Sequence, residues 1–383
     1  MGKKKKIFII HFHPLELYPP VMNMIDYLGK EKGIELIVVS NRKLSNNLLA
    51  AYIPPAGVKI YRPTSQKSLI LLRYVNYMLF YIGSLFSLII HRPEIVLYFE
   101  TLSSWPALMY KKMKGKRIRL MVHYHEYTEP KLYEEGMFLS KWMYGFENKM
   151  YHHFSWISHT NPVRMQMFKK DNSLEKMPEN IFHIIPNYPS KSWLHSVKKN
   201  GLKPGKKRLV FVGSLGYENM YLQEVIDWLG KHTDDFSLDV YSYNIDDKAK
   251  EVLEINNFKN IRYCGGRDYQ SLPTVLSNYD IGIVIYKPFS QNTIHAVSNK
   301  VFEYLACGLD VWFSIDMTYT FNYVRKDVFP KLLPVNFMEF DSFDPGRAIA
   351  REGLSYDPGI YFYENIYPEI LAHISNDNSE MVI

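Results

Sequence analysis

The chain has 383 residues, of which 47% are hydrophobic and 15% aromatic, and its formal net charge is +7. This length predicts about two or three domains, with two favoured, and the apolar content excludes a disordered chain. The charge is a modest excess of 46 basic over 39 acidic residues. We therefore expect no nucleic-acid partner.

Cysteine usage and the N-terminus both indicate a cytoplasmic protein. Cys264 and Cys307 fall within predicted core elements, which favours a reducing compartment without a disulfide framework. The lysine run at 3–6 is followed by an apolar stretch, 7–10, that is too short for the core of a secretory signal.

Residues 74–90 carry no charge. A membrane-spanning helix needs about 20 apolar residues, so this run is slightly short. We expect a buried or surface-docked helix of an α/β domain. Peripheral contact with an anionic membrane, at its inner face, stays open as an alternative, because a basic cluster at 111–119 would suit it. A solvated face is the more common role of such a cluster.

Strand and helix patterns alternate through the first half of the chain, which predicts a parallel sheet built from β-α-β units. We expect strands at 7–12, 34–39, 95–99, 117–123, 155–158 and 181–185, a short strand within 52–61, and helices at 21–30, 68–90, 105–113, 140–152 and 161–170.

A polar, basic stretch with Pro and Gly at 188–207 is the best candidate for a linker, and the α/β alternation restarts after it. We therefore expect a first domain at 1–187, a second at 208–354 and a tail at 355–383. Strands are predicted at 208–212, 239–243, 261–263, 281–286 and 311–313, and helices at 222–229, 246–255, 272–276 and 299–306; the tail should hold an amphipathic helix, interrupted near Pro368.

The stretch 299–308 follows a polar loop and opens a helix that Gly308 should stop. Lys300 and Glu303 are three residues apart and share one side of the helix. The helix N-terminus and Lys300 favour a phosphate group, and Glu303 can accept hydrogen bonds from ribose hydroxyls. The alternative is an amphipathic core helix whose Lys and Glu are solvated.

A second candidate site follows the strand predicted at 117–123. It holds His123, His125 and Glu126, and ligands of open α/β sheets bind beyond the carboxyl ends of strands. Zinc is one interpretation, but no further Cys or His cluster accompanies these residues at ligand spacing. We expect no metal, and we interpret His123 as a packing or loop residue.

Several of these features resemble, in order and spacing, the GT-B glycosyltransferases of the retaining family 4, or group 1, type. The features are Pro186-Asn187, the run 211–216, Tyr263-Cys264-Gly265 and the stretch 299–309. The resemblance covers most of the chain and is strongest at 208–311. It implies two Rossmann-like domains facing across a cleft, with a C-terminal helix that crosses back to the first domain.

For the donor site, the resemblance implies that Glu303 holds the ribose of a nucleotide sugar and that Asn299 and Lys300 lie beside it. His295 stands where the family has the first of two glutamates, so the acidic pair is broken. Gly213 and Ser214 match the turn near the donor phosphates, but the Arg and Lys that usually follow are missing.

Three cations are candidates for the missing phosphate-binding charge: Lys300, Arg267 and Lys287. The resemblance further implies that Gly265, Gly266 and Arg267 run beside the nucleobase, and that His125 lies near the reacting carbon.

The activity implied is metal- and cofactor-independent transfer of a sugar from a UDP- or GDP-sugar to a glycan or lipid-linked acceptor, with retention, in cell-envelope polysaccharide or glycan synthesis. Two alternatives stay open. One is a non-catalytic scaffold or nucleotide-sugar-binding protein with a degraded donor site, which the broken acidic pair motivates. The other is a sugar-nucleotide epimerase on the same fold, which needs extra acids near the sugar.

Overall fold

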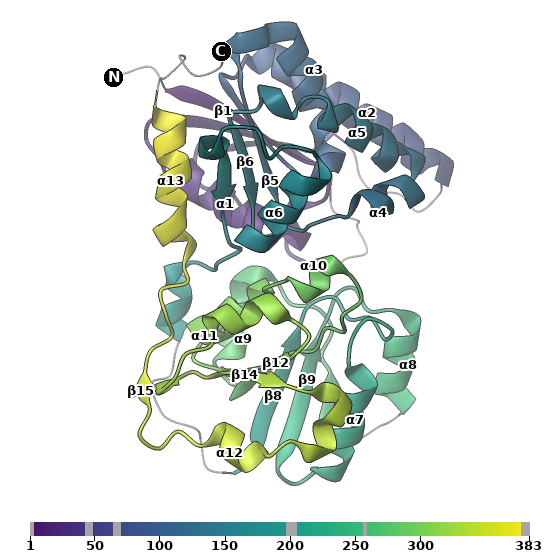
Figure 1. Ribbon diagram of the computed structural model, residues 1–383, viewed down its shortest axis with the longest axis vertical. Helices are drawn as coiled ribbons and strands as arrows, with labels where there is room; N and C mark the ends of the chain where they lie inside the picture. Colours follow the sequence, from purple (N-terminus) through teal and green to yellow (C-terminus); the bar gives the residue numbers. More distant parts are fainter. Residues whose placement is uncertain (1–3, 43–48, 64–69, 197–204, 256–258, 377–383) are drawn as a thin grey trace. The chain divides into compact units, whose positions relative to one another are not determined.

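The computed structural model describes residues 4–42, 49–63, 70–196, 205–255 and 259–376 (Figure 1). It divides into two compact units, one formed by Met1–Asn187 with Tyr363–Ile383 and the other by Tyr188–Phe362. Each unit is built on its own parallel sheet with helices, which confirms the predicted α/β fold class. Three predicted features lie partly outside the described residues: the lysine run at 3–6, the helix at 68–90 and the end of the tail.

The sheet of the first unit has seven parallel strands in the order β3-β2-β1-β4-β5-β6-β7. The strands are β1 (Lys5–His11), β2 (Ile34–Ser40), β3 (Lys59–Tyr61), β4 (Ile95–Phe99), β5 (Arg119–Tyr124), β6 (Trp156–His159) and β7 (Phe182–Ile184). The register pairs His11 with Phe99 and Phe99 with His123. These residues therefore lie side by side at the carboxyl edge of the sheet, and the loops after β1, β4 and β5 start there.

Helices cover this sheet, and their apolar faces explain the predicted patterns. They are α1 (Pro19–Gly29), α2 (Ile70–His91), α3 (Ser104–Lys114), α4 (Pro130–Glu135), α5 (Phe138–Asn148) and α6 (Pro162–Asp171). Phe8 and Ile10 of β1 alternate with residues that face the other side, and they join Phe80 and Tyr81 of α2 in one core. The expectation of a docked, rather than membrane-spanning, α2 fits this packing.

The C-terminal helix, α13 (Tyr363–Ser375), belongs to the first unit, as the fold prediction required. Its last carbonyls are capped by a cation of the sheet: the Arg119 guanidinium donates to the carbonyls of His373 at 2.7 Å and Ile374 at 2.6 Å. The predicted interruption near Pro368 is wrong. Pro368 lies inside the helix, held between the buried Tyr367 and Ile370.

The sheet of the second unit has the order β10-β9-β8-β11-β12-β14. The strands are β8 (Lys207–Val212), β9 (Phe236–Tyr241), β10 (Ile261–Tyr263), β11 (Ile281–Val284), β12 (Asp310–Ser314) and β14 (Leu332–Val335), and β13 (Val328–Phe329) pairs with β15 (Ser355–Tyr356) apart from it. The helices are α7 (Leu222–Lys231), α8 (Asp247–Ile255), α9 (Leu272–Leu276), α10 (Gln291–Ile294), α11 (Asn299–Ala306) and α12 (Pro345–Ile349). The sequence analysis did not anticipate α10, α12 or the strands after β12.

The predicted linker is partly a structured element of the second unit. The ring of Tyr188 lies 4.5 Å from that of Phe302, and the buried Trp193 lies 5.1 Å from Tyr269. Residues 197–204 of this linker lie outside the described residues. The polar and basic composition of the stretch favoured a linker, and the packing of Tyr188 and Trp193 was not predicted.

The two cysteines differ in burial. Cys307 is buried at the end of α11, as expected of a core residue, but Cys264 is only partly buried. Cys264 follows β10, which is an edge strand and therefore has one open side. Both thiols are free.

Helix α11 is held against the sheet by Tyr304. The Tyr304 hydroxyl accepts a hydrogen bond from the Val212 N–H at 2.9 Å, at the end of β8. Its ring lies over Gly282 of β11, where a Cβ atom would meet the ring at 2.1 Å. Gly308, with φ of +81°, follows the helix, as predicted for its stop.

We expect Gly282→Ala to destabilise the second unit by about 2 kcal/mol or more, because the new methyl group requires the Tyr304 ring to move. Urea and thermal unfolding measure the change. Gly145→Ala is the control, since nothing lies within 4 Å of its Cβ position in α5 and Ala is favoured in helices. Equal stability of Gly282→Ala and the wild type would show that Tyr304 does not fix α11.

Candidate functional site

At the carboxyl edge of the second sheet, the glycine turn after β8 lies beside the start of α11, and these are the two parts of the predicted phosphate site. Gly213 follows β8 with φ of +144°, a conformation that favours glycine. Its Cβ position lies 3.9 Å from Cε of Lys300, the second residue of α11. The cation and the start of a helix therefore lie beside the glycine turn, which is an arrangement suited to an anion.

Glu303 is buried, with 1% of its surface exposed, so the alternative of a solvated carboxylate is wrong. Its Oε2 lies 2.7 Å from Nζ of Lys300, and its Oε1 accepts a hydrogen bond from the Asn299 amide at 2.8 Å. Each carboxylate oxygen has a further lone pair for another donor. The side chain is therefore fixed in place by two contacts, and both of its oxygens retain acceptor capacity.

Ser214 joins the loop after β8 to the loop after β9. Its hydroxyl donates to the Asn244 carbonyl at 3.2 Å and accepts from the Asn244 amide at 2.8 Å. Asp246 adds a second connection, because its carboxylate accepts from the Tyr217 N–H at 2.8 Å. These contacts fix the backbone around the glycine turn.

The three candidate cations have different surroundings. Lys287 forms an ion pair with Glu224 at 3.3 Å, and Arg267 is exposed with its guanidinium 5.7 Å from the Tyr241 ring centroid. Among the described residues, Lys300 is the one of the three that is shown beside Gly213. Lys300 is therefore the best-placed candidate for the missing phosphate-binding charge.

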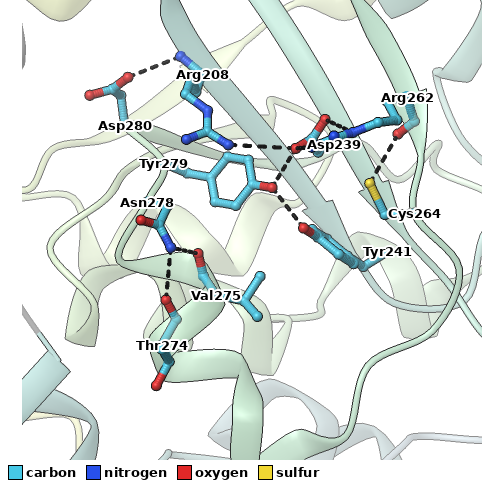
Figure 2. A network of polar contacts seen from close by, with 10 residues as sticks. All are labelled: Arg208, Asp239, Tyr241, Arg262, Cys264, Thr274, Val275, Asn278, Tyr279 and Asp280. Atoms are coloured by element: carbon cyan, nitrogen blue, oxygen red, sulfur yellow. Dashed lines mark hydrogen bonds and ion pairs between the residues drawn. The ribbon is translucent and has the colours of Figure 1, made fainter.

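A polar network fixes the loop predicted to run beside the nucleobase (Figure 2). Arg262 of the edge strand β10 donates twice to Asp239 of β9, at 2.6 and 3.1 Å. The Tyr279 hydroxyl donates to the same carboxylate at 2.5 Å and lies 2.8 Å from the Tyr241 hydroxyl. The bidentate contact holds β10 in register, and so positions Gly265, which follows it.

Tyr243, which the sequence analysis did not single out, lies against this loop. A Cβ atom at Gly266 would be 1.8 Å from its ring, so a glycine is needed there for the ring to approach. The Tyr243 hydroxyl is buried without a partner among the described residues, and burial raises its pKa. An aromatic residue just beyond β9 was the available signal for a surface on which a base can stack.

His295 follows the short helix α10, which a capping box between Ser290 and Thr293 starts. Its Nδ1 lies 3.3 Å from the Thr318 hydroxyl. The side chain is partly buried on the loop before α11. The capping box and this contact fix the position of the loop that carries His295.

In the first unit, His125 lies just beyond β5 and is buried. Its ring stacks on Phe99 at 5.2 Å, and its Nδ1 lies 3.3 Å from the Asn187 amide oxygen, whereas Nε2 has no partner among the described residues. Burial lowers the pKa of His125 to about 4, so the ring is neutral at pH 7. With the proton on Nδ1 facing Asn187, Nε2 is left as an acceptor.

Glu100, which the sequence analysis missed, contacts this histidine. Its carboxylate accepts a hydrogen bond from the His125 N–H at 2.6 Å. Its backbone has φ of 62° and ψ of 153°, a region that costs a non-glycine residue about 1–3 kcal/mol. Burial, together with the Glu126 charge, raises the pKa of Glu100 to about 8. A glutamate directly after the buried strand β4 was the available signal.

One cation lies at this edge among neutral histidines. Arg164 of α6 donates to the His125 carbonyl at 3.1 Å, and burial lowers the pKa of Arg164 only to about 10, so its guanidinium stays charged at pH 7. His11 and His123 are buried, and burial lowers the pKa of both. His123 lies 2.9 Å from the Ser158 hydroxyl, and the Tyr18 ring lies 4.5 Å from His11.

A pocket lined by Thr101 and Glu126, among others, is too small for a sugar, because the centre of a water molecule could occupy only about 10 Å³ of it. Within the described ranges, no group of three or more His, Cys, Asp or Glu side chains is placed to hold a metal.

Comparison with known proteins supports the fold. No protein-family model matches the sequence, and a search of curated proteins finds no match. Among solved structures, sucrose-phosphate synthase from Thermosynechococcus elongatus is similar with a TM-score of 0.68 and 13% identity, over 97% of this chain and 100% of that one. HepE from Anabaena, solved in complex with UDP-glucose, has a TM-score of 0.63 and 10% identity, over 97% and 99%.

UDP-N-acetylglucosamine 2-epimerase is also similar, with a TM-score of 0.61 and 12% identity over 97% of both chains. Glycosyltransferases of the GT-B fold are thus among the structural neighbours, over nearly the whole chain. At these identities the likeness shows the fold, and it confirms the predicted GT-B type of two Rossmann-like domains.

We expect the stability of the wild type to fall, relative to that of Glu100→Gln, as the pH rises from about 4.5 to about 8. In this window the unfolded chain releases the Glu100 proton while the folded protein retains it, so ionisation favours unfolding. The difference between the two proteins should change by at least about 1 kcal/mol. Thermal unfolding at a series of pH values measures it.

Glu135→Gln is the control for this pH series, because Glu135 is exposed on α4 and should leave the profile of the wild type unchanged. If Glu100→Gln and the wild type show parallel profiles, Glu100 does not hold a proton in the folded protein.

Proposed function

We propose that this protein is a retaining glycosyltransferase that moves a sugar from a nucleotide-sugar donor to a glycan or lipid-linked acceptor. The observation that carries the proposal is the buried Glu303, fixed by Asn299 and Lys300 beside the glycine turn at Gly213. A buried carboxylate next to an anion site matches the two polar parts of a nucleoside diphosphate, the ribose hydroxyls and the phosphates.

The donor is assigned to the second unit, group by group. Glu303 accepts the ribose hydroxyls, while Lys300 and the start of α11 stabilise the diphosphate. The base lies along Gly265 and Gly266, where the Tyr243 ring offers a stacking surface. HepE, a structural neighbour, was solved with UDP-glucose, which supports a UDP-sugar among the UDP- and GDP-sugars considered.

The proposed transfer breaks the bond between the anomeric carbon and the phosphate oxygen and forms one to the acceptor oxygen. The acceptor proton passes to the departing phosphate, and attack on the same face gives retention. Negative charge develops on the diphosphate, so a fixed cation and helix N–H groups lower the barrier. No metal or cofactor is required in this scheme.

On the first unit, we assign His125 to the sugar near the reacting carbon. Its neutral Nε2 is a buried acceptor with an unmet hydrogen bond among the described residues, which a sugar hydroxyl would satisfy. Glu100, protonated below about pH 8, offers a hydrogen-bond donor at the same edge.

We further propose that the protein works in the cytoplasm, at the inner face of a membrane, in cell-envelope polysaccharide or glycan synthesis. A lipid-linked acceptor requires contact with a membrane surface. The exposed apolar residues of α2 support such contact.

A second candidate function is epimerisation of a nucleotide sugar. The charge of Glu126 helps to raise the pKa of Glu100, and burial holds the proton on Glu100, so an acid lies near a second carboxyl group at the carboxyl edge of the first sheet. The epimerase among the structural neighbours shows that the fold allows this chemistry. Incubating a UDP-sugar in deuterated water without acceptor separates the two: an epimerase incorporates deuterium into the sugar, and a transferase does not.

The scaffold alternative rests on His295 in place of an acid and on the missing Arg and Lys after Gly213. Lys300 weakens it, because this residue supplies a cation at the turn. Thermal shift with UDP, GDP and ADP tests it directly, since no stabilisation by any of them would favour a scaffold.

We expect Glu303→Ala to weaken UDP binding by about tenfold to a hundredfold, because two charge-assisted hydrogen bonds to the ribose are lost. Titration calorimetry measures the affinity. 2′,3′-Dideoxy-UDP is the matched control, as Glu303→Ala should bind it as the wild type does. An equal loss for both ligands would assign Glu303 to positioning Lys300 instead.

We expect His125→Ala to lower turnover at least about tenfold while the Kd for UDP is unchanged, because His125 belongs to the other unit and orients the sugar. Release of UDP from a donor that the wild type uses measures turnover. His152→Ala, an exposed histidine of the same unit, should behave as the wild type. Unaltered turnover of His125→Ala would remove His125 from the reaction.

A further inference from the structure

Helix α2 exposes an apolar stripe along its length. Eight residues of α2 are between 36% and 63% exposed, and they recur at helical spacing: Tyr74, Val75, Met78, Leu79, Ile82, Phe86, Ile89 and Ile90. All eight are apolar or aromatic. Only 22% of the apolar window from Tyr74 to His91 is buried, although such a window resembles a membrane span in hydropathy. A soluble helix normally carries charges on this face.

The opposite face of α2 is already used by the core of the first unit. Phe80, Tyr81 and Leu88 are buried there, and the Tyr81 hydroxyl donates to the Leu102 carbonyl at 3.0 Å. The helix cannot leave this core to span a bilayer without exposing these side chains. The exposed stripe therefore indicates a partner surface that contacts α2 while the helix stays packed on the core of the first unit.

The neighbouring helices extend the surface. Helix α3 packs between α2 and α5, and the three lie on one side of the first unit (Figure 1). On α5, Phe138 is 82% exposed and Trp142 is 46% exposed, one helical turn apart. Trp142 stacks on Phe146, and the Lys112 ammonium of α3 lies 4.3 Å from the Phe146 ring centroid. Apolar residues of α2 and α5 thus flank the cations of α3.

The charge on this surface has one sign. Residues 104–117, which form α3 and the turn after it, contain five basic residues and no acidic residue. Lys112 of α3 is exposed, and so are Lys116 and Arg117 just after the helix. The α2 and α3 helices both run antiparallel to the strands, so these cations lie near the Ile89 and Ile90 end of the stripe.

We propose that this surface, formed by α2, α3 and α5, docks on an anionic lipid bilayer. The apolar side chains enter the interface, the Trp and Tyr rings lie at headgroup level, and the lysines contact acidic headgroups. Charge complementarity favours lipid over a second copy of the chain, because a symmetric pair of this face would bring its cations together.

This surface also continues toward the carboxyl edge of the first sheet. The Tyr74 end of α2 and the Phe138 end of α5 lie at that edge, because both helices run antiparallel to the strands, and His125 lies there too. A lipid-linked acceptor held in the bilayer would therefore meet the proposed acceptor groups. The access of a lipid-linked acceptor to this edge rests on the proposed function, whereas the docking of the surface on lipid does not.

Flotation with vesicles tests the docking. The wild-type chain should float with vesicles of phosphatidylcholine and phosphatidylglycerol, less with phosphatidylcholine alone, and less at high salt. The double variant Ile82→Asp/Phe86→Asp should lose at least about tenfold in vesicle affinity, because two charges must enter the interface. Replacing Lys112, Lys116 and Arg117 with Gln should lower the affinity for anionic vesicles by about fivefold per charge.

Met338→Asp/Ile360→Asp is the matched control, because both residues are exposed apolar positions of the second unit, and it should float as the wild type does. UDP binding and thermal unfolding of each variant report on folding, so lost flotation with retained UDP binding separates docking from the donor site. Failure of the wild type to float, or equal loss in the control, overturns the proposal. A dimer that Ile82→Asp/Phe86→Asp dissociates, without vesicle binding, would assign the face to a second copy.

Discussion

The proposed donor site depends on the contact of Tyr304 with the central strands of the second sheet. The ring occupies the space that Gly282 leaves open, and the hydroxyl accepts the Val212 N–H where β8 ends. Glu303 and Lys300 precede Tyr304 on the same short helix, so one side chain in the core sets the position of two side chains in the site. The buried carboxylate then orients the lysine toward Gly213 by an ion pair of 2.7 Å.

The two units offer different electrostatic environments, and the proposed reaction needs both. At the edge of the second sheet Lys300 and Glu303 form an ion pair at 2.7 Å, which suits the proposed diphosphate and ribose. At the edge of the first sheet, burial keeps His125 neutral and Glu100 protonated near neutral pH. Neutral side chains accept a sugar at a lower desolvation cost than charged ones and still offer hydrogen bonds. The strain at Glu100 indicates that its position is imposed by the surrounding fold.

The sequence could predict the alternating elements, the fold type and the motif at 299–308, because periodicity and glycine turns are local signals. It could not predict Glu100, since neither a positive φ nor a raised pKa is visible before the loops after β4 and β5 are brought together. Tyr243 was missed for the same reason, as its contact with Gly266 joins two loops. Pro368 was misjudged because the packing of α13 outweighs the loss of one helical hydrogen bond.

Hydropathy alone could not decide the role of α2, because the helix is apolar on both faces and the apolar composition of each face has a different cause. Phe80 and Leu88 are apolar because they fill the core, but packing among the described residues of the unit gives no reason for Ile82 or Phe86 to be so. On a helix face that contacts only water, exposed residues without packing contacts are ordinarily polar. The apolar stripe, continued by Trp142 and bordered by lysines, is the feature that the proposed contact with lipid explains.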